Sequence, residues 1–167
     1  MQIRPERPAD IADIRAVNLA AFEGKTEADL VDALREQAVP IISLVADDNG
    51  AIVGHIFFSP AILLAHAALD IMALAPMAVL PTRQRQGIGS ALIREGLARC
   101  RQLDAIAVVV LGHARYYPRF GFTRGSRFGV TCEYDVPDDV FMVLELHQGS
   151  LQGKSGTIRY HPAFAGR

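Results

Sequence analysis

Several features that would point to a particular function class are scarce in this chain. It has no tryptophan, two cysteines in 167 residues and a formal net charge of −1. A balanced charge gives no reason to expect general affinity for nucleic acid. Cys100 and Cys132 have neither a CxxC pattern nor zinc-ligand spacing. We therefore expect reduced thiols in a cytoplasmic protein and no metal site.

Long apolar runs are also missing. No stretch of about 18 apolar residues could span a bilayer, and the opening residues Met1-Gln2-Ile3-Arg4-Pro5 show no apolar signal region. Half of the residues are hydrophobic, which is ordinary for a globular protein. We expect one domain with a hydrophobic core and no membrane contact. The sequence is compatible with a homo-oligomer.

Hydrophobic periodicity predicts an alternation of strands and helices. We expect helices over 8–21, from Thr26 onward with a capping-box-like Thr26-x-x-Asp29, over 87–101, and a short helical segment near 116–120. Expected strands cover 2–4, 41–46, 51–58, 69–80, 105–111, 140–146 and 157–160. Pro76 lies inside the fourth of these and predicts a bulge or an edge. This order predicts an α/β domain.

The segment from Met77 to Leu92 carries the most information about function. An apolar run ends at Pro81, a basic and amide-rich loop follows, and Gly87-Ile88-Gly89 opens an amphipathic helix. Backbone N–H groups at a helix start are unpaired and the helix dipole is positive there. Glycine lets the backbone approach a ligand closely. The pattern predicts a site for phosphate or pyrophosphate.

Other interpretations of the glycine-containing segments stay open at this level. A dinucleotide-binding fingerprint would need Gly or Ala where Leu92 stands. The stretch from Gly149 to Ser155 has three residues between its glycines where a P-loop has four, so we interpret it as a turn or linker. Arg83 and Arg85 are also compatible with a solvated basic loop. The hypothesis that this is a nucleotide-binding protein is supported only by these imperfect motif matches.

Two motifs together resemble one enzyme family. Gln84-Arg85-Gln86-Gly87-Ile88-Gly89 resembles the Gln/Arg-x-x-Gly-x-Gly/Ala acetyl-coenzyme A motif of the GCN5-related N-acetyltransferases (GNAT), and Tyr117-Pro118-Arg119-Phe120-Gly121-Phe122 resembles the family's Tyr-x-x-x-Gly-Phe element. The runs 111–122 and 156–164 are similar to the YhbS-type branch. The resemblance implies a single-domain α/β fold with a mixed, mostly antiparallel sheet, splayed central strands and flanking helices. It implies an acetyltransferase domain over 1–147 and a C-terminal extension over 148–167.

The resemblance also implies a cofactor site for acetyl-CoA as co-substrate, without a metal. Backbone groups of Met77, Ala78 and Val79 would pair with the pantetheine arm. The pyrophosphate would be held by backbone N–H groups of Gln84, Arg85, Gln86, Gly87, Ile88, Gly89 and Ser90, with charge added by Arg83 or Arg85. Many relatives carry an asparagine after the fifth strand, where this chain has Gly112 and His113.

The implied reaction is direct transfer of an acetyl group to a primary amine of a small metabolite or a protein. The Val79 N–H would stabilise the oxyanion and Tyr117 would protonate the thiolate, while we interpret Tyr116 as a packing residue. His113 is the candidate base; a water relay, His55, Glu23, Asp70 and Glu133 are alternatives. We expect an acidic acceptor site between the first two helices, the strand end near His113 and the segment 127–139. A non-catalytic acyl-CoA-binding regulatory module is the alternative function.

Overall fold

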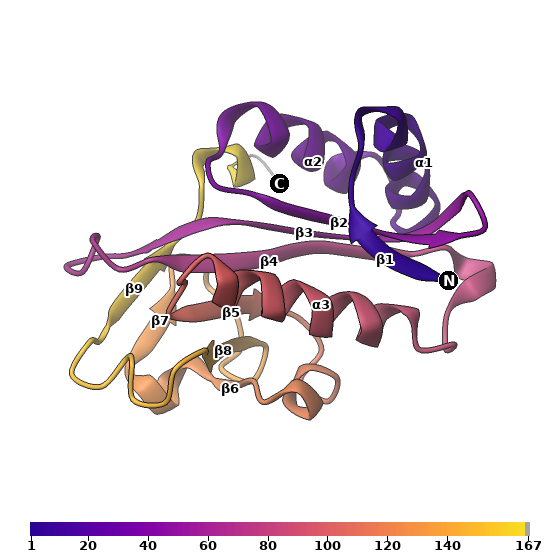
Figure 1. Cartoon of the computed structure of the whole chain (residues 1–167). Coiled ribbons are helices and arrows are strands. Elements are labelled where there is room, and N and C mark those ends of the chain that lie inside the picture. Colours follow the sequence, from indigo (N-terminus) through magenta and orange to yellow (C-terminus); the bar gives the residue numbers. More distant parts are fainter. Residues whose placement is uncertain (166–167) are drawn as a thin grey trace.

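The computed structural model describes residues 1–165, which form one twisted sheet with helices on both faces (Figure 1). The helices are α1 (Ile11–Ala21), α2 (Thr26–Gln37) and α3 (Ile88–Gln102). The strands are β1 (Gln2–Pro5), β2 (Ile42–Asp48), β3 (Ala51–Leu63), β4 (Ile71–Val79), β5 (Ala107–Leu111), β6 (Thr123–Arg124), β7 (Val130–Cys132), β8 (Phe141–Glu145) and β9 (Gly156–Arg159).

The main sheet has the strand order β1-β2-β3-β4-β5-β8-β6, and β9 joins it by pairing with the end of β3 and with β7. Within the main sheet β4 and β5 run parallel, and the other neighbours run antiparallel. The parallel pair needs a crossover, which α3 provides. The expected mixed, mostly antiparallel α/β architecture is confirmed.

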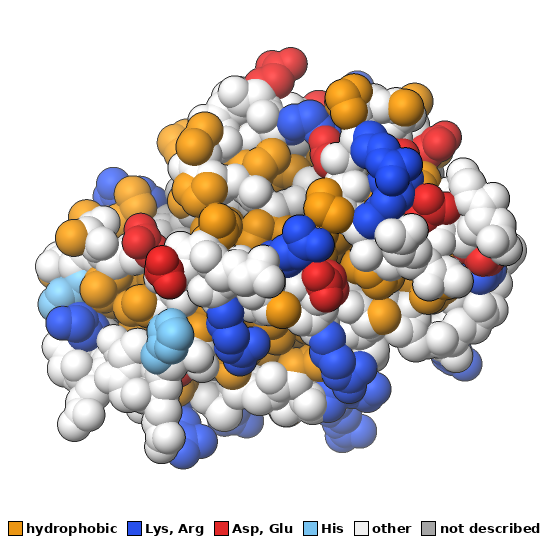
Figure 2. All heavy atoms as spheres, viewed as in Figure 1, with side chains coloured by type: hydrophobic (Ala, Val, Ile, Leu, Met, Phe, Trp, Pro, Cys, Tyr) orange, Lys and Arg blue, Asp and Glu red, His pale blue; other side chains and the backbone are white. Residues whose placement is uncertain are grey.

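Each face of the sheet has its own apolar core. On one face α1 and α2 cover Val45, Phe57 and Val109, and on the other α3 covers Phe58 and Val108. Figure 1 shows the two groups of helices on opposite sides of the strands. The apolar side of the predicted amphipathic helix is buried in α3, with Leu92, Ile93, Gly96, Leu97 and Cys100 facing the sheet. On the face drawn in Figure 2, basic and acidic side chains are interspersed with apolar ones.

The parallel strands β4 and β5 pair over a short length and then separate. Their register joins Ile71 to Ala107 and ends at Ala73, which pairs with Val109. Just beyond, three steps along β4 from Leu74 to Met77 match two steps along β3. This is the bulge predicted at Pro76, and a bulge bends the strand that carries it. The remaining part of β4 is therefore left without β5 as a neighbour.

Several local details differ from the sequence expectations, including the strands β6 and β7, which were not expected. The predicted capping box of α2 is wrong: Lys25 is the N-cap residue without a side-chain cap, and Asp29 instead accepts a hydrogen bond of 2.9 Å from Arg15 of α1. An ion pair to the neighbouring helix has replaced a local cap. Strand β3 is longer than expected and continues to Leu63, because its last residues pair with β4 and with β9.

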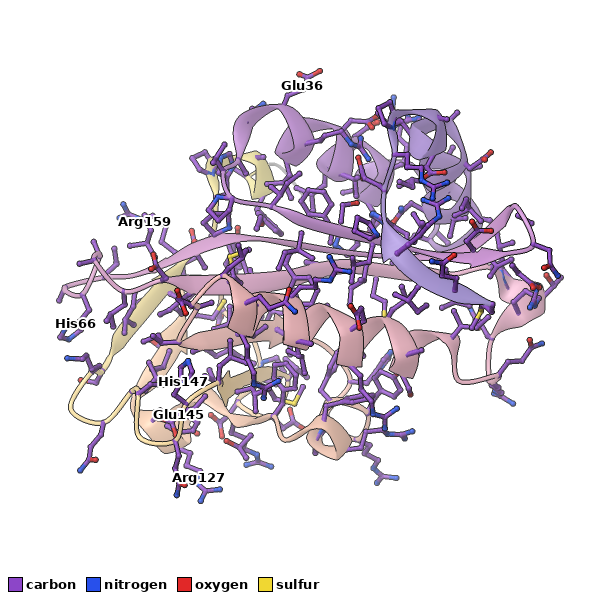
Figure 3. All side chains as sticks on the ribbon, viewed as in Figure 1. Glu36, His66, Arg127, Glu145, His147 and Arg159 are labelled. Carbon is purple, nitrogen blue, oxygen red and sulfur yellow. The ribbon has the colours of Figure 1, made fainter. Side chains whose placement is uncertain are left out.

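The residues after 147 pack on the same core as α1 and α2. Leu151, Ile158, Tyr160 and Phe164 are buried there. The stretch from Gly149 to Ser155 forms turns, as interpreted from the sequence. Its N–H groups at Gly149 and Leu151 donate to the carboxylate of Glu145, at 3.3 and 2.8 Å, so an internal carboxylate occupies these donors (Figure 3).

Among residues 1–165, no helix combines the length and the apolar character needed to cross a membrane.

Candidate active site

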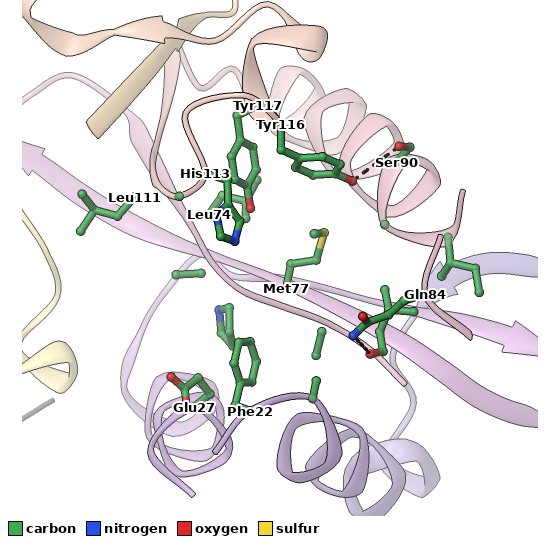
Figure 4. Close-up of a pocket in the computed structure, with 18 of the residues that line it drawn as sticks. Phe22, Glu27, Leu74, Met77, Gln84, Ser90, Leu111, His113, Tyr116 and Tyr117 are labelled. Atoms are coloured by element: carbon green, nitrogen blue, oxygen red, sulfur yellow. Dashed lines mark hydrogen bonds between the residues drawn. The ribbon is translucent and has the colours of Figure 1, made fainter. Parts of the chain in front are cut away.

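A cleft of about 1500 Å³ opens where β4 and β5 separate. It passes from the α3 face of the sheet, where Ser90, Tyr116 and Tyr117 line it, to the opposite face, where Phe22 and Glu27 line it (Figure 4). Its wall is built from β4 (74–79), the glycine loop and the start of α3, the segment after β5, and the junction between α1 and α2. The predicted cofactor and catalytic elements therefore meet in one cleft.

The glycine loop has the backbone geometry of an anion site. Arg85 and Gly87 both have positive φ, at 64° and 83°, and Gly87 is the residue immediately before α3. Alternation of such conformations aims successive N–H groups into one concavity. Ala91 N–H is bonded to Gly87 O at 3.1 Å. The N–H groups of Ile88, Gly89 and Ser90 precede it in the first helical turn, where no intrahelical acceptor exists.

The two loop arginines have different partners. Arg83 forms a 2.9 Å ion pair with Asp48 and donates to Gln86 Oε1 at 3.1 Å. Gln86 is exposed, and its side chain lies against Arg83 rather than in the lining of the cleft. Arg85 lines the cleft and has no ion-pair partner within residues 1–165. Arg119, which the sequence analysis did not single out, has its guanidinium carbon 4.8 Å from the centre of the Tyr116 ring and lines the cleft together with Arg83 and Arg85.

The end of β4 turns part of its backbone toward the cleft. Gln84 Nε2 donates to Val79 O at 3.2 Å, and Leu80 N–H donates back to Val53 O of β3 at 2.9 Å. In a strand, N–H and C=O of one residue point to the same side and alternate along the chain. The backbone of Val79, and by alternation that of Met77, therefore faces away from β3. Ala78 pairs with His55 of β3, and its side chain is buried.

Tyr117 stands in the wall of the cleft with its ring fixed by aromatic neighbours. Its ring makes edge contacts with Tyr116 and Phe122, with centroids 5.2 and 5.7 Å apart. The left-handed Gly121 ends the turn that carries it. Burial, with a smaller effect of the neighbouring Tyr116, raises the pKa of Tyr117 to about 12. Its hydroxyl is therefore protonated at neutral pH.

Tyr116 does more than pack. Its hydroxyl lies 3.5 Å from Ser90 Oγ, and a Cβ placed on Gly89 would lie 3.0 Å from the same hydroxyl (Figure 4). Tyr116 thus contacts the first turn of α3. The motif position Gly89 is explained here by close contact, whereas Gly87 is explained by its positive φ, since nothing lies within 4 Å of a Cβ there.

Only some of the candidate bases line the cleft. His113 follows β5, is exposed, and extends into the cleft as Tyr117 does (Figure 4). Glu23 also lines the cleft. Asp70 lies outside the lining, at the opposite end of β4. Glu133 is also outside it, and its carboxylate accepts the N–H of Tyr160.

His55 is fully buried in the core away from the cleft. Its ring nitrogens contact Asn18 Nδ2 at 3.2 Å and Ser43 Oγ at 2.9 Å. Burial lowers the pKa of His55 to about 3. His55 is therefore a neutral core residue and no longer a candidate base. The residues around His55 in the sequence do not show whether its side chain is a buried structural group or a catalytic base.

The side of the cleft that the sequence analysis predicts for the acceptor contains residues that it did not name. The segment 127–139 contributes Tyr134 and Val136, whereas Arg127 points outward at the edge of the molecule (Figure 3). The C-terminal segment adds Tyr160 and Phe164, and α2 adds Glu27. The available signal in the sequence was the spacing of Tyr160 and Phe164, two aromatic residues four positions apart in the C-terminal segment. Within the described residues, no group of three His, Cys, Asp or Glu side chains gathers as a metal site would require.

Comparison with known proteins agrees with this geometry. The family model described as Acetyltransferase (GNAT) domain matches residues 41–124. The Uncharacterized N-acetyltransferase YhbS of Escherichia coli strain K12 is 35% identical over 165 residues, which cover 98% of each chain.

Two solved structures extend the comparison. The Escherichia coli YhbS structure in complex with CoA has a TM-score of 0.92 and 34% identity, covering 98% of this chain and 91% of that one. A GNAT family acetyltransferase from Brucella melitensis in complex with acetyl-CoA has a TM-score of 0.80 and 38% identity, covering 98% and 97%. A matching family model and a relative of this identity over nearly the full length place this chain in the GNAT family of N-acetyltransferases.

Proposed function

We propose that this enzyme binds acetyl-CoA in the cleft between β4 and β5 and transfers the acetyl group directly to a primary amine. The observation that carries the proposal is the separation of the two strands beyond Ala73. The glycine loop, which follows β4, and Tyr117, which follows β5, both line the cleft that this separation opens. The relatives solved with CoA and acetyl-CoA, 34% and 38% identical over most of their length, support this use of the cleft.

Each part of the cofactor has a matching surface. The pyrophosphate suits the N–H groups from Gln84 to Ser90, helped by the cation of Arg85 and, at the rim, by Arg119. The pantetheine amides suit the outward backbone of Met77 and Val79, as an added strand would. A Val79 N–H that faces the cleft is also placed to donate to the thioester oxygen as it becomes an oxyanion.

The chemistry requires two proton transfers. An alkyl amine has a pKa of about 10 and must lose a proton before it attacks the thioester carbon. His113, directly or through water, is the group after β5 that can accept it. The nitrogen–carbon bond forms, the tetrahedral intermediate collapses, and the carbon–sulfur bond breaks. The departing thiolate accepts a hydrogen bond from the Tyr117 hydroxyl and then takes its proton from solvent.

The raised pKa of Tyr117 defines how it can act. A free thiol has a pKa of about 8.5, so a phenol of pKa about 12 does not give up its proton before the thiolate has formed. Tyr117 instead offers a hydrogen bond that strengthens as charge grows on sulfur. Burial thus keeps the donor in its protonated form throughout the cycle.

The test is release of free CoA thiol with a panel of primary amines, using wild type and Tyr117→Phe. We expect turnover with wild type and a loss of about 10²- to 10⁴-fold in kcat for the variant, with the KM for acetyl-CoA nearly unchanged. Calorimetric titration with CoA provides the control for an intact cleft. Tight CoA binding without turnover on any amine would instead support the regulatory-module alternative.

A cytoplasmic site of action is part of the proposal. Cys100 and Cys132 are both free thiols, which is the usual state of cysteines in a reducing compartment.

A further inference from the structure

We propose that the acceptor is an arylalkylamine, a primary amine joined through a short alkyl chain to an aromatic ring. This inference rests on the proposed function and specifies its acceptor. It comes from a row of aromatic side chains on the acceptor side of the cleft together with carboxylates at the junction of α1 and α2.

The aromatic row consists of Tyr134, Tyr160 and Phe164. The rings of Tyr134 and Tyr160 are stacked, with centroids 5.5 Å apart and planes inclined by 28°. Phe164 continues the row, 5.1 Å from Tyr160. All three line the cleft. Tyr160 and Phe164 are largely buried, at 6% and 4% exposed, so Tyr134, which is 38% exposed, offers most of the aromatic surface that a ligand can reach.

The row is held in place by hydrogen bonds and strand pairing. Strand β9, which leads into Tyr160, pairs with β3 and β7, and the Tyr160 N–H donates to Glu133. His161 Nδ1 accepts from the N–H of Ala163 at 3.0 Å and starts the short helical turn Pro162–Phe164, which contacts α2. A ligand ring would therefore meet a surface that is already ordered, which lowers the entropic cost of binding.

Charge is distributed unevenly along the cleft. The lining cations Arg83, Arg85 and Arg119 all belong to the loop and α3 side. The lining carboxylates Glu23 and Glu27 belong to the α1–α2 junction, where Glu27 lies close to Phe22 in the close-up (Figure 4). Carboxylates favour an ammonium group, and aromatic faces attract cations as well as rings. The acceptor side thus suits a molecule with a cationic end and an aromatic body.

This composition distinguishes among amines. An aliphatic polyamine can place an ammonium group over an aromatic face, but it has no ring to stack there, and its several charges would need more carboxylates than the two in the lining. An arylalkylamine uses both features at once, because its ring can stack on Tyr134 while the nitrogen reaches toward the carboxylates and the thioester carbon. Aromatic pairs contribute beyond their buried area by an amount equal to about 2- to 12-fold in affinity.

The experiment compares kcat/KM for phenethylamine and n-butylamine in wild type, Tyr134→Ala, Tyr134→Phe and Leu103→Ala. Tyr134 is 38% exposed, so its truncation should leave the fold intact. We expect wild type to prefer phenethylamine, and the preference ratio to fall about 3- to 10-fold in Tyr134→Ala and to recover in Tyr134→Phe. Leu103, at the exposed end of α3 and outside the cleft, serves as the control that keeps the ratio.

A second measurement separates this inference from the proposed function. Phenethylamine is titrated calorimetrically into each variant with CoA present. Binding that weakens in Tyr134→Ala but without turnover would retain the aromatic acceptor site and overturn catalysis. Turnover that favours n-butylamine, spermidine or a lysine-containing peptide, with a ratio unchanged in Tyr134→Ala, would retain catalysis and overturn the arylalkylamine assignment.

Discussion

Gly112 is the residue that makes space for the Tyr117 ring. A Cβ placed on Gly112 would lie 2.3 Å from Cε2 and 2.9 Å from Cδ2 of that ring, distances that real Cβ atoms do not tolerate. Tyr116 and Phe122 contact the same ring edge-on and restrict where it can move. The departure from the family pattern after the fifth strand therefore coincides with the position of Tyr117, the proposed hydrogen-bond donor to the thiolate.

Gly112→Ala should displace Tyr117 and lower kcat at least about 10-fold, because the hydroxyl would no longer face the thiolate. The KM for acetyl-CoA should change little. The measurement is steady-state kinetics with a double-mutant cycle through Tyr117→Phe. If the two substitutions act through the same hydroxyl, their effects will be non-additive. Fully additive effects would show that Gly112 acts elsewhere.

The pH dependence of the reaction should carry no falling limb from Tyr117 below about pH 11. Burial raises the pKa of Tyr117 to about 12, so the protonated donor persists where an ordinary tyrosine would ionise near 10. The phenolate absorbance of wild type minus Tyr117→Phe, followed by ultraviolet titration, reports this group alone. A difference signal that titrates near pH 10 would contradict the assigned environment.

Gly87→Asp should weaken CoA binding more than Gly87→Asn. Both variants carry the strain of a side chain at φ 83°, and both Asp and Asn tolerate this region comparatively well, so their difference isolates charge. A carboxylate beside the pyrophosphate should cost about tenfold more in Kd than the amide, and the gap should shrink in high salt. Equal affinities in calorimetry would place the pyrophosphate away from this loop.

Glu23→Gln should raise the KM of a cationic amine about 2- to 5-fold and leave the KM of acetyl-CoA unchanged, since Glu23 lines the acceptor side and is solvent-exposed. Glu133→Gln is expected to act differently. It should lower the melting temperature, because the hydrogen bond from the Tyr160 N–H loses its charged acceptor. Amine KM values measured for both variants decide the matter. An unchanged amine KM in Glu23→Gln would remove that carboxylate from the acceptor site.

His55 should make the protein less stable as the pH falls below 6.5. Its folded pKa is lowered to about 3, so only the unfolded state gains this proton between pH 6.5 and 3, and unfolding is favoured by about 2 kcal/mol at pH 5. Urea unfolding at pH 7 and pH 5 measures the loss. In His55→Gln the loss should shrink by about that amount; an identical loss would mean that other groups account for it.

Local sequence determined the elements that depend on neighbours within one or two turns. The amphipathic pattern of α3 placed Leu92, Ile93 and Leu97 inside, and the glycine loop before it has the open helix start that its residues predict. The turn between β2 and β3 is also closed locally, with Gly50 N–H donating to Asp47 Oδ1 at 2.7 Å. Such features depend on backbone sterics and on hydrophobic periodicity, and the residues of the segment itself determine both.

Tertiary structure alone decided the composition of the cleft. Arg83 and Arg85 are two residues apart, look alike in sequence and both line the cleft, yet Arg83 is ion-paired with Asp48 of β2 and Arg85 has no ion-pair partner within residues 1–165. His55 and His113 are distinguished only by packing, which buries one and exposes the other. Tyr160 reaches the acceptor side because β9 pairs with β3, about a hundred residues earlier. Contacts between distant segments depend on how the whole sheet closes, and no local pattern contains that information.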